Sequence, residues 1–314
     1  MKKAARISIK ILAVILITII ALIGALNIVV RIAYAPYFKI SGKICPISGL
    51  SEGFVPQGTT FDDSTGTVIT CGYMVDNCPS RIYRTDPKTN SYTFYSLMSN
   101  GKPFFGHTGG IQYSDGKLYL ANEGDGLYIF DAKLPEGESV IDIGSPLKMN
   151  NHTSFVFADE TGLYVGEFNN DKEYQTENII TFKGKTQRAV VEKFDFDNLE
   201  DPVEVYSIPN LAQGFAVTDD GSIVISTSYG LSSSKFLVFY DDGIKSTDRT
   251  YRGAPLYFLD EPSAVLSAPP MSEDLDMVDG KLVYLSESAS SKYFFGKLLF
   301  NFYVNTVDID NADF

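Results

Sequence analysis

The sequence predicts an all-β fold, a five-bladed β-propeller with four-stranded blades, preceded by one N-terminal transmembrane helix. A hairpin pattern recurs five times: a polar residue, a short apolar strand, an Asp/Gly turn and a second apolar strand. Its openings, at positions 57, 107, 152, 213 and 273, lie 50, 45, 61 and 60 residues apart, which is the spacing of a four-stranded blade. An uncharged apolar run, residues 11–30, precedes all five copies.

The clearest copy of the hairpin runs from Gly106 to Tyr113 and turns at Gly116 into a second strand. The other four open at Gln57, His152, Gln213 and Glu273 and turn at Gly66, Gly162, Gly221 and Gly280. Third strands that end in a turn-forming Asp are expected at 81–86, 127–131, 190–195, 236–241 and 302–308. Fourth, outer strands are expected at 91–97, 139–143, 202–208 and 255–259.

The fifth repeat reaches the end of the sequence without an outer strand. Residues 38–45 have strand composition and no partner of their own, so we expect them to complete the fifth blade. This closure would join the two ends of a propeller over 38–314 and remove open sheet edges. A six-bladed alternative would need a further blade within 170–187 or 242–270.

The N-terminus predicts a membrane anchor. Residues 1–10 form a basic tail, and 11–33 form an apolar segment long enough to cross the bilayer as a helix. Four basic residues precede the apolar run and one follows it, which predicts a single-pass cell-membrane protein with a cytoplasmic N-terminus and the propeller outside. A cleaved signal peptide is the alternative, because Ala33-Tyr34-Ala35 resembles a cleavage site. The length of the run and Pro36 directly after this site favour a retained anchor.

The charge of the chain is divided unevenly. Residues 1–37 carry five basic residues and no acid, so the remainder has 21 basic and 39 acidic residues, a net charge of −18. Such a surface repels nucleic acid and attracts cations, and we therefore expect no nucleic-acid partner.

Three cysteines fit an exported protein that uses disulfides little. A Cys71–Cys78 disulfide would clamp the loop that leaves the second strand of blade one. The alternative is two unpaired small residues in a loop. Cys45 is left over and is expected to be buried.

Polar residues are expected to gather at one mouth of the central channel. In a propeller the first strands start and the second strands end on the same face. The repeat openings Gln57, His107, His152, Gln213 and Glu273 should therefore meet the second-strand exits Asn122, Glu123, Glu167 and Glu287.

We assign His107, His152 and Glu273 as candidate metal ligands or catalytic acid/base groups, with calcium, zinc or manganese as the candidate ion. The remaining six, Gln57, Gln213, Asn122, Glu123, Glu167 and Glu287, are candidate ligand-binding residues. The alternative for the openings is structural, since a polar residue there can bond the backbone of the neighbouring blade.

Several functional classes have no supporting motif. The sequence contains no P-loop, no dinucleotide-binding glycine motif, no serine-hydrolase elbow and no zinc-protease motif. Gly58, Gly109, Gly110 and Gly214 have a structural explanation, because they fall where inner strands crowd the axis.

A set of short motifs resembles exported or membrane-anchored propeller proteins of Gram-positive bacteria over about residues 38–310. The motifs are Pro56-Gln57-Gly58, Gly72-Tyr73-Met74, Ser80-Arg81-Ile82-Tyr83, Gly106-His107-Thr108-Gly109-Gly110-Ile111, Ser286-Glu287-Ser288-Ala289-Ser290, Lys292-Tyr293 and Gly296-Lys297. This chain departs from that pattern at Glu273-Asp274, where the relatives carry Glu-Gly. More remotely, the plan is similar to lactonase, strictosidine-synthase and streptogramin-lyase propellers, whose motifs are not matched, so no activity is inferred from them.

Three functions follow as alternatives. The first is a module that binds a small ligand, a glycan fragment or a cation at the channel mouth. The second is a metal-assisted hydrolase or lyase at the same site. The third is a protein-interaction scaffold whose channel is merely filled.

Overall fold

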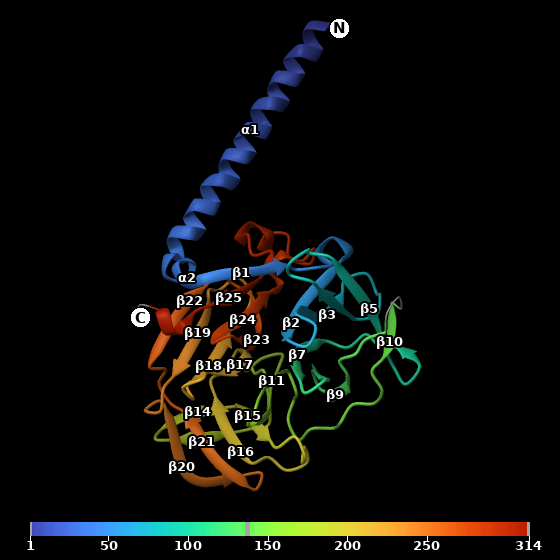
Figure 1. Cartoon of the computed structure of the whole chain (residues 1–314). Helices are drawn as coiled ribbons and strands as arrows, with labels where there is room; N and C mark the ends of the chain where they lie inside the picture. The colour runs from blue at the N-terminus through green and yellow to red at the C-terminus, as the bar shows by residue number, and fades with distance from the viewer. Residues whose placement is uncertain (1, 136–138, 313–314) are drawn as a thin grey trace.

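A computed structural model describes residues 2–135 and 139–312. It confirms the all-β prediction: five blades surround a central channel, and one long helix projects from the propeller (Figure 1). The inner strands are β2 (Phe54–Asp62), β7 (Thr108–Ser114), β11 (Phe155–Asp159), β17 (Ala212–Val217) and β23 (Ser272–Val278). All five are first strands of the predicted hairpins.

The other strands of each blade lie outward of these five. Blade one adds β3 (Thr67–Met74), β4 (Arg81–Thr85), β5 (Tyr92–Ser99) and the short β6 (Lys102–Pro103), and blade two adds β8 (Lys117–Asn122) and β9 (Gly126–Asp131). Blade three adds β12 (Gly162–Gly166), β15 (Ala189–Phe194) and β16 (Glu204–Ile208). Blade four adds β18 (Ile223–Thr227), β19 (Ser234–Phe239) and β22 (Ala264–Ala268), and blade five adds β24 (Lys281–Ser286), β25 (Tyr303–Val307) and β1 (Ser41–Pro46).

The outer strand expected for blade two belongs to blade one. Within residues 139–143, β10 (Val140–Asp142) pairs in parallel with β5, and blade two has three strands in its described sheet. The Asp142 carboxylate accepts the backbone N–H groups of Asn100 and Gly101 at the end of blade one. Ile141 packs into the apolar layer that also holds Leu97. These contacts hold the crossing segment on the neighbouring blade.

The prediction that residues 255–259 form the outer strand of blade four is also wrong. Residues 255–259 lie in β21 (Ala254–Leu259), which pairs in parallel with β16 of blade three, while β22 takes the outer position in blade four. Together with β20 (Ile244–Tyr251), β21 extends blade three to six strands. Leu256 and Phe258 pack there against Val205 and Ile180, the latter from the hairpin β13 (Ile180–Phe182) and β14 (Lys185–Gln187).

The two ends of the propeller meet in blade five. β1 pairs antiparallel with β25, from Ser41 opposite Val307 to Pro46 opposite Tyr303. The strand starts at 41 rather than 38 because Ala35–Ile40 form the short helix α2, with a proline in its first turn. The buried Tyr37 of α2 accepts a 2.6 Å hydrogen bond from the Tyr284 hydroxyl. The segment before the propeller is therefore fastened to the inner part of blade five.

Helix α1 (Lys2–Ala33) stands away from the propeller (Figure 1). Its portion Lys10–Ala33 is long and apolar enough to cross a membrane, either as an anchor or as a signal sequence. Its large side chains are exposed, as for Ile17 and Leu22, whereas Val30 at its foot is buried. An exposed apolar helix of this length has the properties required to sit in lipid.

The inner strands approach each other too closely for side chains at several glycines. A Cβ on Gly58 would lie 2.7 Å from the Cα of Gly110, and one on Gly110 would lie 2.8 Å from Oδ2 of Asp274. The structural explanation given for these glycines holds, since neighbouring backbones fill the space. Below its mouth, the channel axis is closely packed.

Candidate functional site

A pocket opens at the end of the channel where the inner strands begin. It encloses about 1100 Å³ including its mouth, and all five blades contribute to its wall. Six of the nine predicted site residues line it: Gln57, His107, Glu123, Gln213, Glu273 and Glu287. The expected convergence of repeat openings and second-strand exits is therefore found for these six.

One-residue β-bulges aim the opening residues into this pocket. In β2, the pairing shifts between Pro56 and Gly58, so Gln57 is the extra residue. In β17 the same shift isolates Gln213, and in β7 it isolates Gly109. A bulge leaves its extra residue outside the ladder and redirects its side chain, which explains how these residues reach the pocket.

The bulge in β23 separates two neighbouring acids. The register shifts between Ser272 and Leu275, a stretch that contains Glu273 and Asp274. Glu273 lines the pocket, whereas the fully buried Asp274 accepts the backbone N–H of Ile111 at 3.0 Å across the channel. One carboxyl therefore faces the pocket and the other holds the inner strands together.

Glu273 and Glu287 form the acidic floor of the pocket. Glu273 is only 3% exposed, and in the described part of the chain its carboxyl has no hydrogen-bond donor. Glu287 is the first residue of the short helix η2 (Glu287–Ala289), and its carboxyl accepts a 3.1 Å hydrogen bond from Nε2 of Gln57. Burial raises the pKa of both carboxyls, and the charge of Glu287 raises the pKa of Glu273 further. The pair therefore retains protons more strongly than exposed glutamates do.

The rim carries a histidine and a lysine. Nδ1 of His107 lies 3.1 Å from Oε2 of Glu123, and its ring packs edge-on against Tyr73 with 4.9 Å between centroids. The Lys292 ammonium lies 4.9 Å from the centre of the Tyr73 ring and donates a hydrogen bond to its hydroxyl. It also lies 5.1 Å from the centre of the Tyr293 ring. A cation thus already lies beside two aromatic rings of the pocket, at the hydroxyl edge of Tyr73.

The aromatic wall was missed as a functional feature by the sequence analysis. Tyr73, Phe168, Tyr174, Tyr229 and Tyr293 line the pocket beside the predicted polar residues. Each lies at, or within about ten residues after, the end of a second strand. That shared position was the available signal, but aromatic residues in a sequence are equally typical of packed cores.

The two histidines do not share a site, contrary to the pairing proposed from the repeat. β7 begins one residue after His107, but β11 begins three residues after His152 and has no bulge. His152 is exposed, does not line the pocket, and gives its backbone N–H to Glu167 at 3.1 Å. Within residues 2–135 and 139–312, no group of three or more His, Cys, Asp or Glu could hold a metal ion. The ligand set His107, His152 and Glu273 is not assembled.

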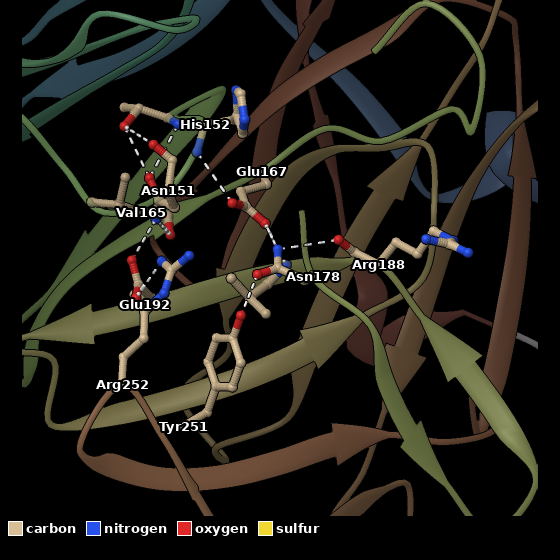
Figure 2. Close-up of polar contacts among 11 residues, drawn as sticks. Asn151, His152, Val165, Glu167, Asn178, Arg188, Glu192, Tyr251 and Arg252 are labelled. Carbon is tan, nitrogen blue, oxygen red and sulfur yellow. Dashed lines mark hydrogen bonds and ion pairs between the residues drawn. The ribbon is translucent and has the colours of Figure 1, made fainter. Parts of the chain in front are cut away.

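Asn122 and Glu167 also lie outside the pocket wall. Asn122 is buried and donates from its amide to Asp125 at 2.8 Å. Glu167 is buried in a separate polar network, where it accepts the backbone N–H groups of His152 and Val190, each at 3.1 Å, and the amide of Asn178 (Figure 2). This carboxyl connects neighbouring segments of blade three and has a structural role in the described contacts.

The same network continues toward the outer edge of blade three. The Tyr251 hydroxyl donates to Asn178, and Arg252 forms a 2.8 Å ion pair with the buried Glu192 (Figure 2). Burial raises the pKa of Glu167 to about 7, against the lowering effects of its backbone donors and of the charge on Arg252. Glu167 therefore titrates near neutral pH.

All three cysteines are free, so the Cys71–Cys78 disulfide is not formed. The Cys71 thiol is buried in β3 and points toward blade two, where it donates to the Thr108 carbonyl at 3.6 Å. Cys78 lies in the following loop, partly exposed. Cys45 is buried, as expected.

No protein-family model and no curated protein sequence matches the chain. It is similar to the PQQ-bound aldose sugar dehydrogenase of Streptomyces coelicolor, with 15% identity over 79% of this chain and 77% of that chain and a TM-score of 0.45. Glutaminyl cyclase of Myxococcus xanthus has 10% identity over 85% and 94% of the two chains and a TM-score of 0.45. BamB of Moraxella catarrhalis has 10% identity over 74% and 80%, with a TM-score of 0.31.

Likenesses this distant transfer no activity to the chain. The resemblance to propeller proteins of Gram-positive bacteria therefore stays a prediction.

Replacing Glu167 by glutamine is expected to change how stability depends on pH. Because the pKa of this carboxyl rises from 4.5 to about 7 on folding, its protonation stabilises the folded state at pH 4.5 and below. That contribution is lost as the pH rises through 7. The unfolding free energy of wild type minus that of Glu167→Gln should fall by ~3 kcal/mol between about pH 4 and pH 8.

Urea unfolding of the full chain in detergent measures this difference. The exposed Glu160→Gln is the matched control and should show no such trend. If the unfolding free energy of wild type minus that of Glu167→Gln stays constant or grows with pH, the raised pKa of Glu167 is contradicted.

Proposed function

We propose that the protein is a membrane-anchored, extracytoplasmic propeller that binds a small ligand, a glycan fragment or a cation in the channel-mouth pocket. The observation that carries this proposal is the carboxyl of Glu273, which is almost fully buried at the floor of an open pocket and lacks a donor in the described structure. Buried polar groups normally have a hydrogen-bond partner, and a ligand in the pocket would supply one.

The composition of the wall supports a small ligand. Its volume, about 1100 Å³ with the open mouth, matches the upper end of the range typical for ligand pockets. Aromatic faces on Tyr73, Tyr174 and Tyr293 offer flat contact surface, and Gln57, Gln213 and the carboxyls offer directional hydrogen bonds. An open, mixed wall of this kind also argues against a channel that is merely filled.

Hydrolysis or elimination at the same pocket is the second candidate. The observation that favours it is the pair Glu273 and Glu287, whose interacting carboxyls both have raised pKa values. Such a pair can keep one group protonated as a general acid while the other acts as a base. The metal-assisted form of this proposal lacks an assembled ligand set among the described residues.

The anchor proposal rests on α1 and its short connection to the propeller. α2 begins two residues after α1 ends, and β1 follows α2 directly, so the propeller would sit against the bilayer. Basic residues before the apolar segment favour a cytoplasmic N-terminus.

Filling the pocket should abolish ligand binding without unfolding the protein. Gln213 lines the pocket and its side chain is partly exposed, so Gln213→Trp occupies the space at little cost to the core. In a thermal-shift panel of mono- and disaccharides, amino acids and amines, at least one compound should raise the Tm of the wild type by about 2 °C or more. The variant should not respond.

The matched control is Lys88→Trp on an exposed turn of blade one, which should respond like the wild type. A panel in which no compound shifts the wild type, or in which Gln213→Trp responds equally, would contradict ligand binding at this pocket.

Impermeant maleimide labelling of intact cells should report the orientation. In a Cys78→Ser background the remaining thiols, Cys45 and Cys71, are buried and burial raises the pKa of both, so they should stay unlabelled. Added Ser91→Cys in the propeller should label, and added Lys3→Cys in the basic tail should label only after permeabilisation. Labelling of Lys3→Cys in intact cells, or release of the propeller without α1, would contradict an N-in anchor.

A further inference from the structure

The pocket already holds a positive charge in a defined position. Lys292 places its ammonium 4.9 and 5.1 Å from the ring centres of Tyr73 and Tyr293 and donates a hydrogen bond to the Tyr73 hydroxyl. Lys292 is an exposed residue of the loop between η2 and the short helix η3 (Gly296–Leu299), so its head can leave without disturbing a strand. The pocket mouth therefore accommodates an ammonium group that can move away.

The charge of the wall is predominantly negative. Four carboxyl side chains line the pocket against one lysine: Glu123, Glu173, Glu273 and Glu287. The chain beyond residue 37 carries a net charge of −18, so the surrounding field also attracts cations and repels anions.

Of the four pocket carboxyls, Glu273 is the buried one that lacks a partner in the described structure, whereas Glu173 is exposed to solvent. Glu287 already accepts from Gln57, and Glu123 is paired with His107. Glu273 has neither a donor nor an ion-pair partner within 2–135 and 139–312, although it is only 3% exposed. A neutral sugar could only exchange hydrogen bonds with this carboxyl, whereas an ammonium ion also supplies the opposite charge, which stabilises its ionised form against the effect of burial.

We infer that the pocket binds an organic ammonium cation, whose charged head displaces the Lys292 ammonium from beside Tyr73 and Tyr293 and reaches deeper than that ammonium to take Glu273 as its counter-ion. The inference rests on the proposed function and narrows its ligand class. The volume of the pocket leaves room for an uncharged portion of the ligand along Phe168 and Tyr174.

Calorimetric titration of the full chain in detergent tests this inference. The probes are choline and n-butylammonium, each compared with a neutral analogue of similar shape, 3,3-dimethylbutan-1-ol and butan-1-ol. At least one cation should bind about tenfold or more tightly than its neutral analogue, because only the cation gains the charge and cation–π interactions.

Two variants change the affinity in opposite directions. Glu273→Gln keeps the shape of the side chain and removes its charge, so the cation should bind about tenfold more weakly. Lys292→Met removes the competing internal cation, so the same cation should bind several-fold more tightly, because it no longer displaces a like charge hydrogen-bonded to Tyr73. Glu160→Gln, an exposed acid outside the pocket, should leave binding unchanged.

Thermal unfolding verifies that each variant is folded. Should Glu273→Gln fail to fold, Tyr293→Leu provides the test, because losing this ring should weaken the cation and leave the neutral analogue unaffected.

Cations that bind no more tightly than their neutral analogues overturn the inference. If a disaccharide then binds the wild type but not Gln213→Trp, the proposed function stands without it. If no probe of either kind binds, the inference and the proposed function both fall.

Discussion

The close approach of the inner strands at the channel axis is the constraint on which the rest of the structure depends. Gly58 and Gly110 let two backbones meet where a Cβ would lie 2.7 Å from its neighbour. Asp274 and Asp276 then tie blade five to blades one and two, and Asp276 accepts Nε2 of Gln112 at 2.6 Å and the Thr60 hydroxyl at 3.0 Å. Because these contacts close the channel, its mouth becomes a pocket with a floor.

The repeat pattern in the sequence was sufficient to predict the five inner hairpins, because apolar alternation and Gly turns are local properties of the chain. It could not assign β10 and β21 to their blades, since the partner of an outer strand depends on tertiary packing and not on the composition of the strand. The bulge that directs Gln57 into the pocket leaves no sequence signal. The exact start of a strand leaves no clear sequence signal either, so His152 looked equivalent to His107. In the structure, β7 begins one residue after His107, whereas β11 begins three residues after His152.

Blade five connects the pocket with the end of the propeller that carries helix α1. The segment between β24 and β25 supplies Glu287, Lys292 and Tyr293 to the pocket, and continues into η3, which lies beside the foot of α1. Phe294 and Phe295 in this segment are exposed, at 76% and 69%. A single segment thus joins the wall of the pocket to the foot of α1.

An experimental structure of the full chain in saturating choline would show whether the pocket holds an ammonium cation beside Glu273. Density for the ammonium group is expected beside Tyr73, Tyr293 and Glu273, with the Lys292 side chain moved out of the pocket. A pocket that contains no ligand while Lys292 keeps its place beside both rings, or choline bound elsewhere on the propeller, would contradict the inferred cation site.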